Sequence, residues 1–384
     1  MNLREIILKQ RNFQKRRGRD KMKIRKNAFF ISLITNILIP LGAVFLALIV
    51  GSVFLITAHV DPLKAYYLMF SASFGSLYGI TETLVKATPL IIVGAGICVA
   101  FRSGMVNIGG EGQIIVGAIL ATFVALKLPS LPRIILVPTL ILAGFVGGGI
   151  YGLIPGVLKA YLNINEILTT VMLNSIATQV LYLLLRGSMM DPLEKAFGTG
   201  YPQSSIITQS AWLTRFFRGK RLHTGIFIAI ILAIAMYYLL WKTTIGYKMR
   251  AVGKNKNASR YGGINVERYM ILSMLIAGGM AGIAGAVEVM GIHHRLLDGI
   301  SAGYGFSGIV AALFGKLNPL GTIPASILFG SILFGADSLQ RTVGIPAAMV
   351  YAIEGLVVVF AVSGEIISRK LVLRNSEILT GEEK

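Results

Sequence analysis

The sequence Asn107-Ile108-Gly109-Gly110-Glu111-Gly112-Gln113 lies between two apolar runs, 87–101 and 112–126. It places a carboxylate, two carboxamides and three glycines inside a chain that otherwise has the composition of a lipid-soluble protein. Polar groups at membrane depth are costly and usually face a protein interior or a watery cavity. Short apolar segments interrupted by glycine are typical of transport sites. The stretch therefore predicts a broken membrane helix whose polar groups are shielded from lipid.

The composition of the chain indicates an integral membrane protein. Of its 384 residues 54% are hydrophobic and 14% are charged, and the mean hydropathy is +0.72. Ordinary soluble domains carry about 25% charged residues. The single cysteine, Cys98, lies inside an apolar run, so an internal disulfide is excluded.

Much of the net charge of +20 is concentrated in two segments that are predicted to lie in the cytoplasm. Residues 1–26 hold eleven Lys/Arg and two acids, and residues 242–268 hold seven and one. Basic segments stay in the cytoplasm and meet anionic lipid headgroups. No nucleic-acid-binding signature accompanies the charge. We therefore expect membrane lipid, and no nucleic acid, as the partner of these basic segments.

Apolar runs predict an all-α, polytopic membrane protein with about ten transmembrane helices, within a range of eight to eleven, and with both termini cytoplasmic. The first run, 27–60, lacks charged residues and is interpreted as an uncleaved helix. The amphipathic segment 61–83 is expected along the outer interface. The predicted spans are 29–57, 84–101, 112–128, 134–158, 167–185, 224–241, 269–290, 302–315, 318–336 and 345–363.

Three regions follow from these spans. Residues 1–26 form a basic cytoplasmic tail, residues 27–364 the transmembrane domain, and residues 365–384 a cytoplasmic C-terminal tail. Within the transmembrane domain, loop 186–224 is predicted outside the cell and loop 242–268 inside it.

Two polar motifs are candidates for a solute pathway. Glu111 and Gln113 can hydrogen-bond a polar solute; alternatively, Glu111 satisfies the exposed N–H groups at the start of the helix that follows it. Asn165 is a candidate cap for the next helix, with Glu166 in its first turn and Asn174 farther along. Capping and ordinary interhelical hydrogen bonding are the alternative roles for this second motif.

Two further motifs concern packing and the cytoplasmic face. Within loop 242–268, Asn255 can cap a short basic helix that Gly262 and Gly263 end. Such a helix could dock on a partner, or the segment could be a plain positive-inside loop. Small residues spaced by four, Gly278 with Gly282 and Gly282 with Ala286, predict a helix-packing face. Its candidate residues are Gly278, Gly282 and Gly285. Glu288 and Glu354 are additional acids within apolar spans that need partners.

Nucleotide-binding and metal-binding motifs are absent from the sequence. It contains no phosphate-binding G-x-x-x-x-G-K-[ST] loop and no H-E-x-x-H. The adjacent His293 and His294 lack the spacing of a metal pair. The chain is therefore expected to be no enzyme, to bind no metal and to hold no ATP of its own.

Four stretches carry a resemblance to a known family. They are Asn107–Gln113 followed by Gly117, Asn165–Asn174, Arg250–Ile264, and Tyr304–Gly315 leading into Asn318–Gly321. On these residues the chain resembles the permease subunits of bacterial ABC importers in the ribose and branched-chain amino acid group. It is most similar to the nucleoside and simple-sugar importers that work with a basic-membrane-protein-type lipoprotein.

The resemblance implies a permease that moves nucleosides, or alternatively simple sugars, across the bacterial cytoplasmic membrane by alternating access. It implies a separate ABC ATPase subunit that binds ATP, a second permease subunit (homologous or identical), an extracytoplasmic substrate-binding lipoprotein, and no cofactor. An ATPase-independent channel or secondary transporter is the alternative from another class, because buried acids are available for ion coupling.

The resemblance implies a segment that couples to the ATPase, whereas the substrate-pathway candidates come from the polar motifs described above. Substrate-pathway candidates are Asn107, Glu111, Gln113, Glu166 and Asn174. The segment expected to couple to the ATPase contains Arg250, Gly253, Lys254, Asn255, Ala258, Tyr261, Gly262 and Ile264.

Overall fold

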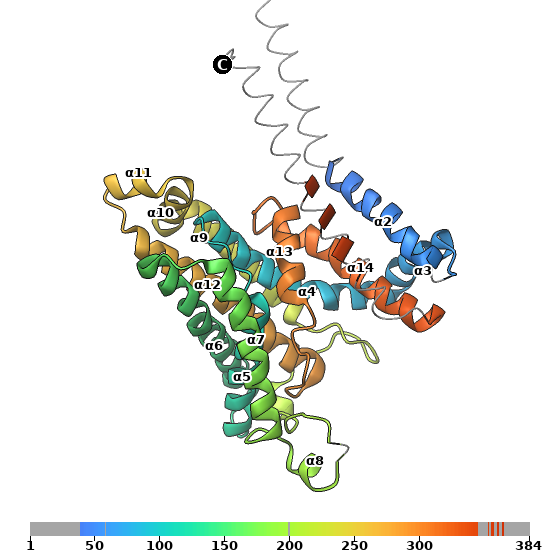
Figure 1. Cartoon of the computed structure of the whole chain (residues 1–384). Coiled ribbons are helices and arrows are strands. Elements are labelled where there is room, and N and C mark those ends of the chain that lie inside the picture. Colours follow the sequence, from blue (N-terminus) through green and yellow to red (C-terminus); the bar gives the residue numbers. More distant parts are fainter. Residues whose placement is uncertain are drawn as a thin grey trace, which may run out of the picture. The chain divides into compact units, whose positions relative to one another are not determined.

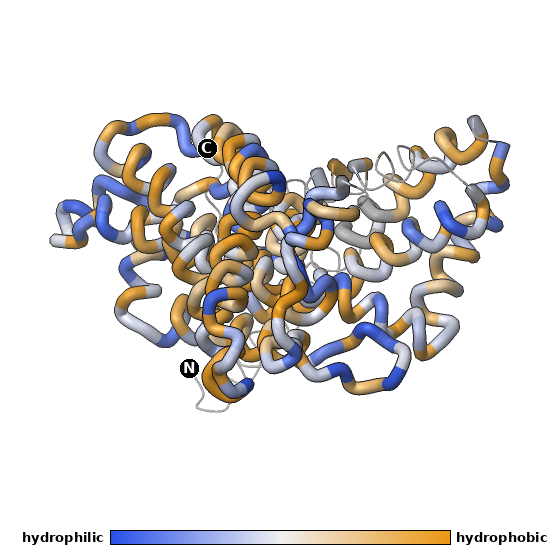
Figure 2. Tube along the Cα trace, turned by 90° about the horizontal axis from the view of Figure 1, so that it is seen from below, coloured by the Kyte–Doolittle hydropathy of each residue, from blue (hydrophilic) through white to orange (hydrophobic). Residues whose placement is uncertain are grey.

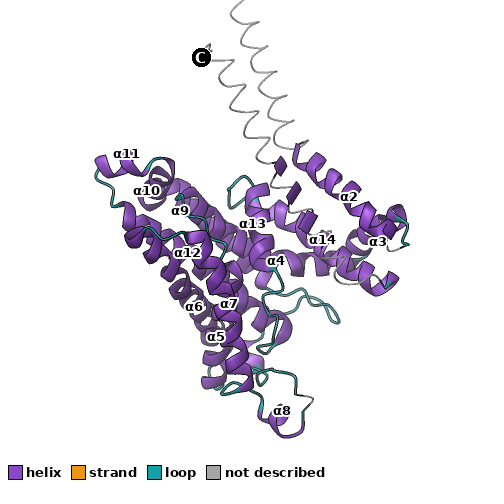
Figure 3. Ribbon diagram, viewed as in Figure 1, coloured by secondary structure: helices purple, strands orange, loops and turns teal. Residues whose placement is uncertain are grey.

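The computed structural model describes residues 39–57, 59–198 and 200–344, together with seven isolated positions between 352 and 364. The described residues form helices and loops, with isolated bridges at Gln203–Leu297 and Arg215–His223 in place of any strand (Figure 3). The predicted tails 1–26 and 365–384, most of the span 345–363, and Glu354 lie outside the described residues. The chain divides into two compact units, residues 1–54 with 355–384 and residues 55–354.

The helices follow one another along the chain with short connections, apart from one longer segment between α7 and α9 (Figure 1). In order they are α2 (Ile39–Thr57), α3 (Pro62–Phe74), α4 (Leu77–Arg102), α5 (Gly110–Lys127), α6 (Arg133–Leu162), α7 (Glu166–Arg186), α8 (Pro192–Phe197), η2 (Gln209–Ala211), α9 (Gly225–Lys242), α10 (Thr244–Lys254), α11 (Lys256–Tyr261), α12 (Val266–Glu288), η3 (Val289–His293), α13 (Tyr304–Phe314) and α14 (Thr322–Val343).

Seven helices in the described part of the chain are long and apolar enough to cross a membrane, and a bent pair formed by Phe45–Thr57 and Pro62–Phe74 would make an eighth. The seven are α4, α5, α6, α7, α9, α12 with its extension to His293, and α14. The span predicted at 302–315 is the 11-residue helix α13, which is too short to cross a bilayer because crossing takes about 20 residues.

The boundary of one predicted span is wrong. Helix α4 begins at Leu77, not near residue 84, so the segment expected along the interface is divided between α3 and the first turns of α4. The Ser76 side chain accepts a hydrogen bond from the Gly79 N–H and caps this earlier start. Apolar residues follow the helices, and hydrophilic residues gather mainly in the connecting segments (Figure 2).

Glycines let α12 pack closely against α5 and α6, which lie beside it (Figure 1). A Cβ atom on Gly282 would lie 2.0 Å from the Gly144 carbonyl oxygen, and one on Gly278 would lie 2.4 Å from the Gly148 carbonyl oxygen. A Cβ atom on Gly285 would lie 2.1 Å from the Ile114 carbonyl oxygen of α5. These distances leave no room for a side chain, so the helices touch backbone to backbone.

Adjacent glycines of α6 provide a matched test of this packing. A Cβ atom on Gly148 would lie 2.2 Å from the Gly278 carbonyl oxygen, whereas one on Gly149 would lie 3.3 Å from its nearest neighbour. We expect Gly148→Ala to lower the free energy of unfolding by about 1–3 kcal/mol through overpacking. In Gly149→Ala the higher helix propensity of alanine, about 1 kcal/mol, offsets the milder crowding.

The measurement is the thermal unfolding midpoint of the purified protein in one detergent. Equal midpoints for the two alanine variants would contradict the backbone contact between α6 and α12.

Candidate functional site

The turn that precedes α5 is closed by its own side chains. The Asn107 amide nitrogen donates to the Gln113 side-chain oxygen at 2.9 Å, and the Gln113 amide nitrogen donates back at 3.1 Å. The Asn107 oxygen also accepts from the Gly109 N–H at 3.0 Å. Both side chains are buried. Their amides therefore stabilise the turn in this conformation and do not face open solvent.

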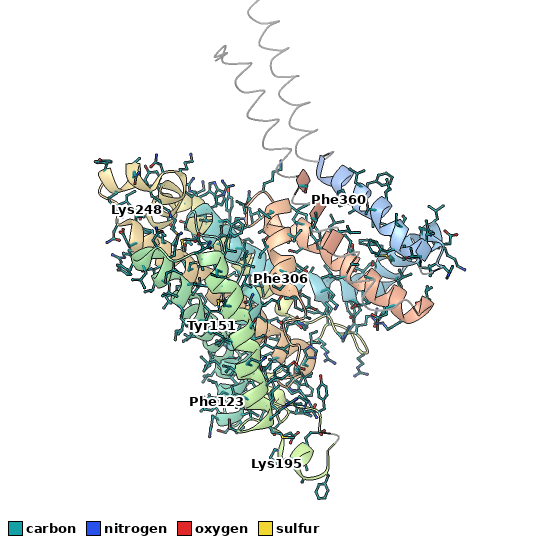
Figure 4. The ribbon with its side chains drawn as sticks, viewed as in Figure 1. Phe123, Tyr151, Lys195, Lys248, Phe306 and Phe360 are labelled. Carbon is teal, nitrogen blue, oxygen red and sulfur yellow. The ribbon has the colours of Figure 1, made fainter. Side chains whose placement is uncertain are left out.

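Asn174 of α7 joins this turn from outside. Its side-chain oxygen accepts from the Gly112 N–H at 2.9 Å, and its amide nitrogen donates to the Ile108 carbonyl at 3.0 Å. The Tyr151 hydroxyl of α6, labelled in Figure 4, donates at 2.6 Å to the carbonyl of Leu173, the residue before Asn174. Helices α5, α6 and α7 are thus connected by polar contacts at the level of the turn.

Glu111 caps a helix that is distant in sequence. Its carboxylate accepts from the Gly305 N–H at 2.7 Å and from the Phe306 N–H at 3.3 Å, both in the first turn of α13. A carboxylate is favourable at that end of a helix because the N–H groups there lack partners and the dipole is positive. The expectation that Glu111 caps its own helix is therefore wrong; the helix it caps is α13.

Glu166 lies apart from this group. Asn165 caps α7 by accepting from the Ile167 N–H at 2.9 Å, which confirms the predicted cap. The Glu166 carboxylate forms an ion pair with Lys159 of α6 at 3.0 Å. The structure therefore brings together four of the five pathway candidates, namely Asn107, Glu111, Gln113 and Asn174, and places the fifth at the junction of α6 and α7.

The basic segment between α9 and α12 folds as two short helices, α10 and α11. The Asn255 side chain accepts from the Ala258 N–H at 3.0 Å, and Gly262 follows the last residue of α11, which confirms the predicted short capped helix. Lys248 of α10 and Lys195 of α8 lie at opposite ends of the unit (Figure 4). Tyr261, at the end of α11, is 95% exposed.

Helix α10 is held tightly against the end of α4. A Cβ atom on Gly253 would lie 2.1 Å from the Arg102 carbonyl oxygen. The guanidinium groups of Arg102 and Arg250 lie 5.4 and 5.7 Å from the centre of the Trp241 ring, within the range of a cation–π interaction. Arg102 also donates to the carbonyls of Lys316 and Leu317, at 3.0 Å each. The basic segment is thereby connected to the turn that follows α13.

The remaining candidates of the basic segment fall into two groups by exposure. Ile264 is half-buried and packs against the cluster that includes Met105 and Val252. The exposed members are Lys254, Asn255, Ala258, Tyr261 and Gly262. An exposed, rigidly held set of this kind is a surface that can contact another protein.

The segment between α7 and α9 is folded back onto the end of α12. Backbone N–H groups of Ser204, Ile207 and Leu213 donate to carbonyls of residues 296, 294 and 290 at 2.9–3.0 Å. The His223 ring is buried next to Gly225 and Gly291, where a side chain would collide with it. Burial lowers the pKa of His223 to about 4, so the ring is neutral at physiological pH.

An ionic cluster was missed by the sequence analysis. Glu82 of α4 is fully buried and forms an ion pair with Arg221. Lys86, one turn later, forms an ion pair with Asp337 of α14 at 2.9 Å. The available signal was two charges spaced by four near the start of an apolar run, a pattern that indicates buried partners once α4 is known to begin at Leu77. The described residues contain no group of His, Cys, Asp and Glu suited to a metal ion.

Comparison with known proteins identifies relatives along most of the chain. Residues 79–362 match the family described as the permease component of the branched-chain amino acid transport system. The guanosine ABC transporter permease protein NupP of Bacillus subtilis is 33% identical over 86% of this chain and 94% of its own length. The glucose ABC transporter permease protein TsgB13 of Haloferax volcanii is 34% identical, over 86% of this chain and 88% of its own. The nucleoside ABC transporter permease protein NupB of Lactococcus lactis is 32% identical, over 85% and 90%.

Proposed function

This chain belongs to the family of branched-chain amino acid transport permease components, and from that membership we propose that it is the permease subunit of an ATP-driven importer of nucleosides. It is a multi-pass protein of the cell membrane and a transport component, not an enzyme. The single observation that carries the nucleoside assignment is the similarity, over more than four fifths of the chain, to permeases named for guanosine and nucleosides. The glucose permease at 34% identity makes a simple sugar the second candidate solute.

The proposed importer contains other subunits. An ABC ATPase binds ATP, an extracytoplasmic lipoprotein delivers solute, and a second permease, homologous or identical, completes the pathway. The absence of a phosphate-binding loop from the sequence supports a separate ATPase. The permease itself works without a cofactor.

The proposed topology has cytoplasmic termini in a bacterial cytoplasmic membrane and a number of spans within the predicted range of eight to eleven, because α13 is too short to count as a full span. Loop 186–224, which contains α8, lies outside, and loop 242–268, with α10 and α11, lies inside. One spanning helix, α9, separates the two loops, which supports their placement on opposite sides of the membrane. The position of α8 and α11 at opposite ends of the unit supports the same placement (Figure 1). The basic tail 1–26, the C-terminal tail 365–384 and the transmembrane domain 27–364 complete the arrangement.

The proposed mechanism is alternating access driven through α11. Movement of α11 by the ATPase reaches α4 through Gly253 and then the turn after α13 through Arg102, because these groups are in direct contact. The other end of α13 is held by Glu111. A displacement of α13 therefore changes the environment of Asn107, Gln113 and Asn174. In this proposal these side chains hold the pathway shut in one state and become available to solute in the other, whereas Glu166 fixes α6 to α7 at its edge.

The experiment is reconstitution into liposomes, with radiolabelled guanosine added to the external solution. We expect uptake when the ATPase, the second permease, the lipoprotein and ATP are all present, and none from this chain alone. Unlabelled nucleosides should compete, whereas unlabelled glucose should not if the first candidate solute is correct. Guanosine flux through the chain alone would support the rival, an ATPase-independent channel or secondary transporter, and would overturn the proposal.

A further inference from the structure

A cavity of about 430 Å³ lies among the ends of α4, α12, α13 and α14, beside the segment that carries Arg221. Its size falls within the range of about 300–1,000 Å³ found for small-molecule sites. Side chains important for its chemistry are Lys86, Arg221, Glu288, His293, Tyr304 and Asp337. None of these belongs to the solute-pathway candidates named from the sequence.

Cationic and carboxylate side chains are equal in number when the cavity wall and Glu82 directly behind it are taken together. Lys86 and Asp337 form an ion pair at 2.9 Å, and Arg221 forms an ion pair with Glu82 behind the wall. Arg341 and Glu288 add one charge of each sign. A site with no excess charge gives little preference to an anion or a cation, since each would meet like charge as well as opposite charge. It favours a neutral solute that makes many hydrogen bonds.

Glu288 provides an acceptor that has no partner within the described structure. The residue is 3% exposed, and its Oε1 atom has no hydrogen bond. Its Oε2 atom lies 3.9 Å from the His293 Nε2 atom, beyond hydrogen-bonding distance. A buried acceptor without a donor is costly, and a bound molecule or ion is one of the established reasons for such a group in a native protein. A hydroxyl group supplies the missing donor without adding charge.

The position of the cavity suits the entry of solute. Arg221 comes from the loop proposed to lie outside the cell, and the lining residues of α12 and α14 belong to the ends of those helices. Tyr304 is the first residue of α13, and the next two N–H groups of that helix bind Glu111. The cavity is therefore connected through the first turn of α13 to Glu111 of the turn 107–113.

We propose that this cavity is the first solute-binding site inside the permease, and that it takes a neutral polyhydroxyl group such as the ribose of a nucleoside, with Glu288 accepting a hydrogen bond from a hydroxyl. This inference depends on the proposed function, because it assumes that a hydroxyl-bearing solute is imported. Asp337 and His293 are placed to contact the remaining hydroxyls.

A thiol reporter tests the cavity directly. The native Cys98 is buried and should react slowly with thiol reagents. Ala302 is an exposed residue of the cavity wall, so Ala302→Cys introduces a thiol that a reagent can reach. The assay measures how fast a maleimide labels this thiol in the assembled transporter, with the probes uridine, uracil and uridine monophosphate. We expect uridine to slow labelling about tenfold at ten times its Kd, by simple occupancy, while uracil and the anionic nucleotide leave the rate unchanged.

Two variants in the Ala302→Cys background test whether the protection by uridine depends on Glu288. Glu288→Gln should reduce the protection by uridine, because an amide oxygen is a weaker hydrogen-bond acceptor than a carboxylate. Asp61→Asn is the matched control, an acid-to-amide change outside the cavity at a helix cap where asparagine serves as well as aspartate. It should keep the protection.

The outcomes separate the two proposals. Nucleoside uptake by the assembled transporter without any protection of the thiol by uridine would overturn the cavity and leave the proposed function standing. Protection by uridine without nucleoside uptake would support the cavity and contradict the proposed function. Equal protection by uracil and uridine would overturn the assignment to ribose.

Discussion

Replacing Tyr261 with alanine is expected to release the ATPase from the transporter. Solute uptake should fall in proportion to the amount of ATPase lost. Tyr261 is 95% exposed at the end of α11, on the face proposed to be cytoplasmic. Aromatic anchors of this kind dominate the binding energy of protein interfaces. Loss of about 2 kcal/mol at such an anchor weakens binding roughly thirtyfold.

The effect depends on the rigidity of α11. The Asn255 cap fixes its first turn, and the contact between Gly253 and Arg102 fixes the helix before it. A tyrosine presented from a rigid support loses little conformational entropy on binding, so most of its contact energy is available for docking. Alanine is a good helix former, and α11 itself should remain intact.

The measurement is the amount of ATPase that co-purifies with tagged permease across a dilution series. Tyr261→Phe is the matched control, because it keeps the ring, and it should retain the ATPase. If Tyr261→Ala retains as much ATPase as the unsubstituted chain, with an unchanged melting midpoint, the docking role of α11 is wrong.

Local capping signals explain which parts of the site could be predicted from the sequence. Asn165 and Asn255 were predicted as caps, and each accepts a hydrogen bond from an N–H group two or three residues later. Both donor and acceptor lie within one turn, so the sequence contains the whole interaction. The apolar runs were predictable for a similar reason, since solubility in lipid depends on local composition.

Partners distant in sequence could not be predicted. Glu111 and the Gly305 N–H are 194 positions apart, and their contact exists because α13 begins beside the start of α5. The periodicity of apolar residues in the sequence does not indicate which helices lie next to each other. Glu82 and Arg221 are 139 positions apart. Arg221 belongs to loop 186–224, which contains six Lys/Arg although it is predicted to lie outside, where basic residues are disfavoured. Once paired with a buried acid, one of those residues is a structural counter-charge and says less about topology.

Arg221→Met is expected to produce the largest loss of stability among single substitutions in the ionic cluster. The Glu82 carboxylate is 0% exposed and accepts from the Arg221 Nε atom at 3.0 and 3.1 Å, with a further hydrogen bond from the Nη2 atom. These hydrogen bonds raise the pKa of Arg221, so the guanidinium stays charged. Methionine removes the positive charge and leaves the carboxylate buried without compensation.

Removing one partner of a buried ion pair costs about 3–5 kcal/mol, whereas replacing both partners with apolar groups is often neutral. We expect the lower end of that range here, because the Arg221 side chain is 44% exposed while Glu82 is fully buried. The double variant Glu82→Met with Arg221→Met should therefore be more stable than Arg221→Met alone. This reversal distinguishes an unpaired charge from simple loss of packing by the arginine, because loss of packing would persist or increase when the second side chain is also changed.

The measurement is the thermal unfolding midpoint of the purified permease, followed by intrinsic fluorescence. Arg218→Met is the control, since Arg218 is an exposed basic residue of the same segment and undergoes the same substitution. Arg221→Met should lower the midpoint by several degrees, Arg218→Met should leave it unchanged, and the double variant should recover most of the loss. Equal midpoints for the two single variants would show that Glu82 is not held by Arg221. The segment between α7 and α9 would then be anchored to α12 by its backbone hydrogen bonds and not by this charge.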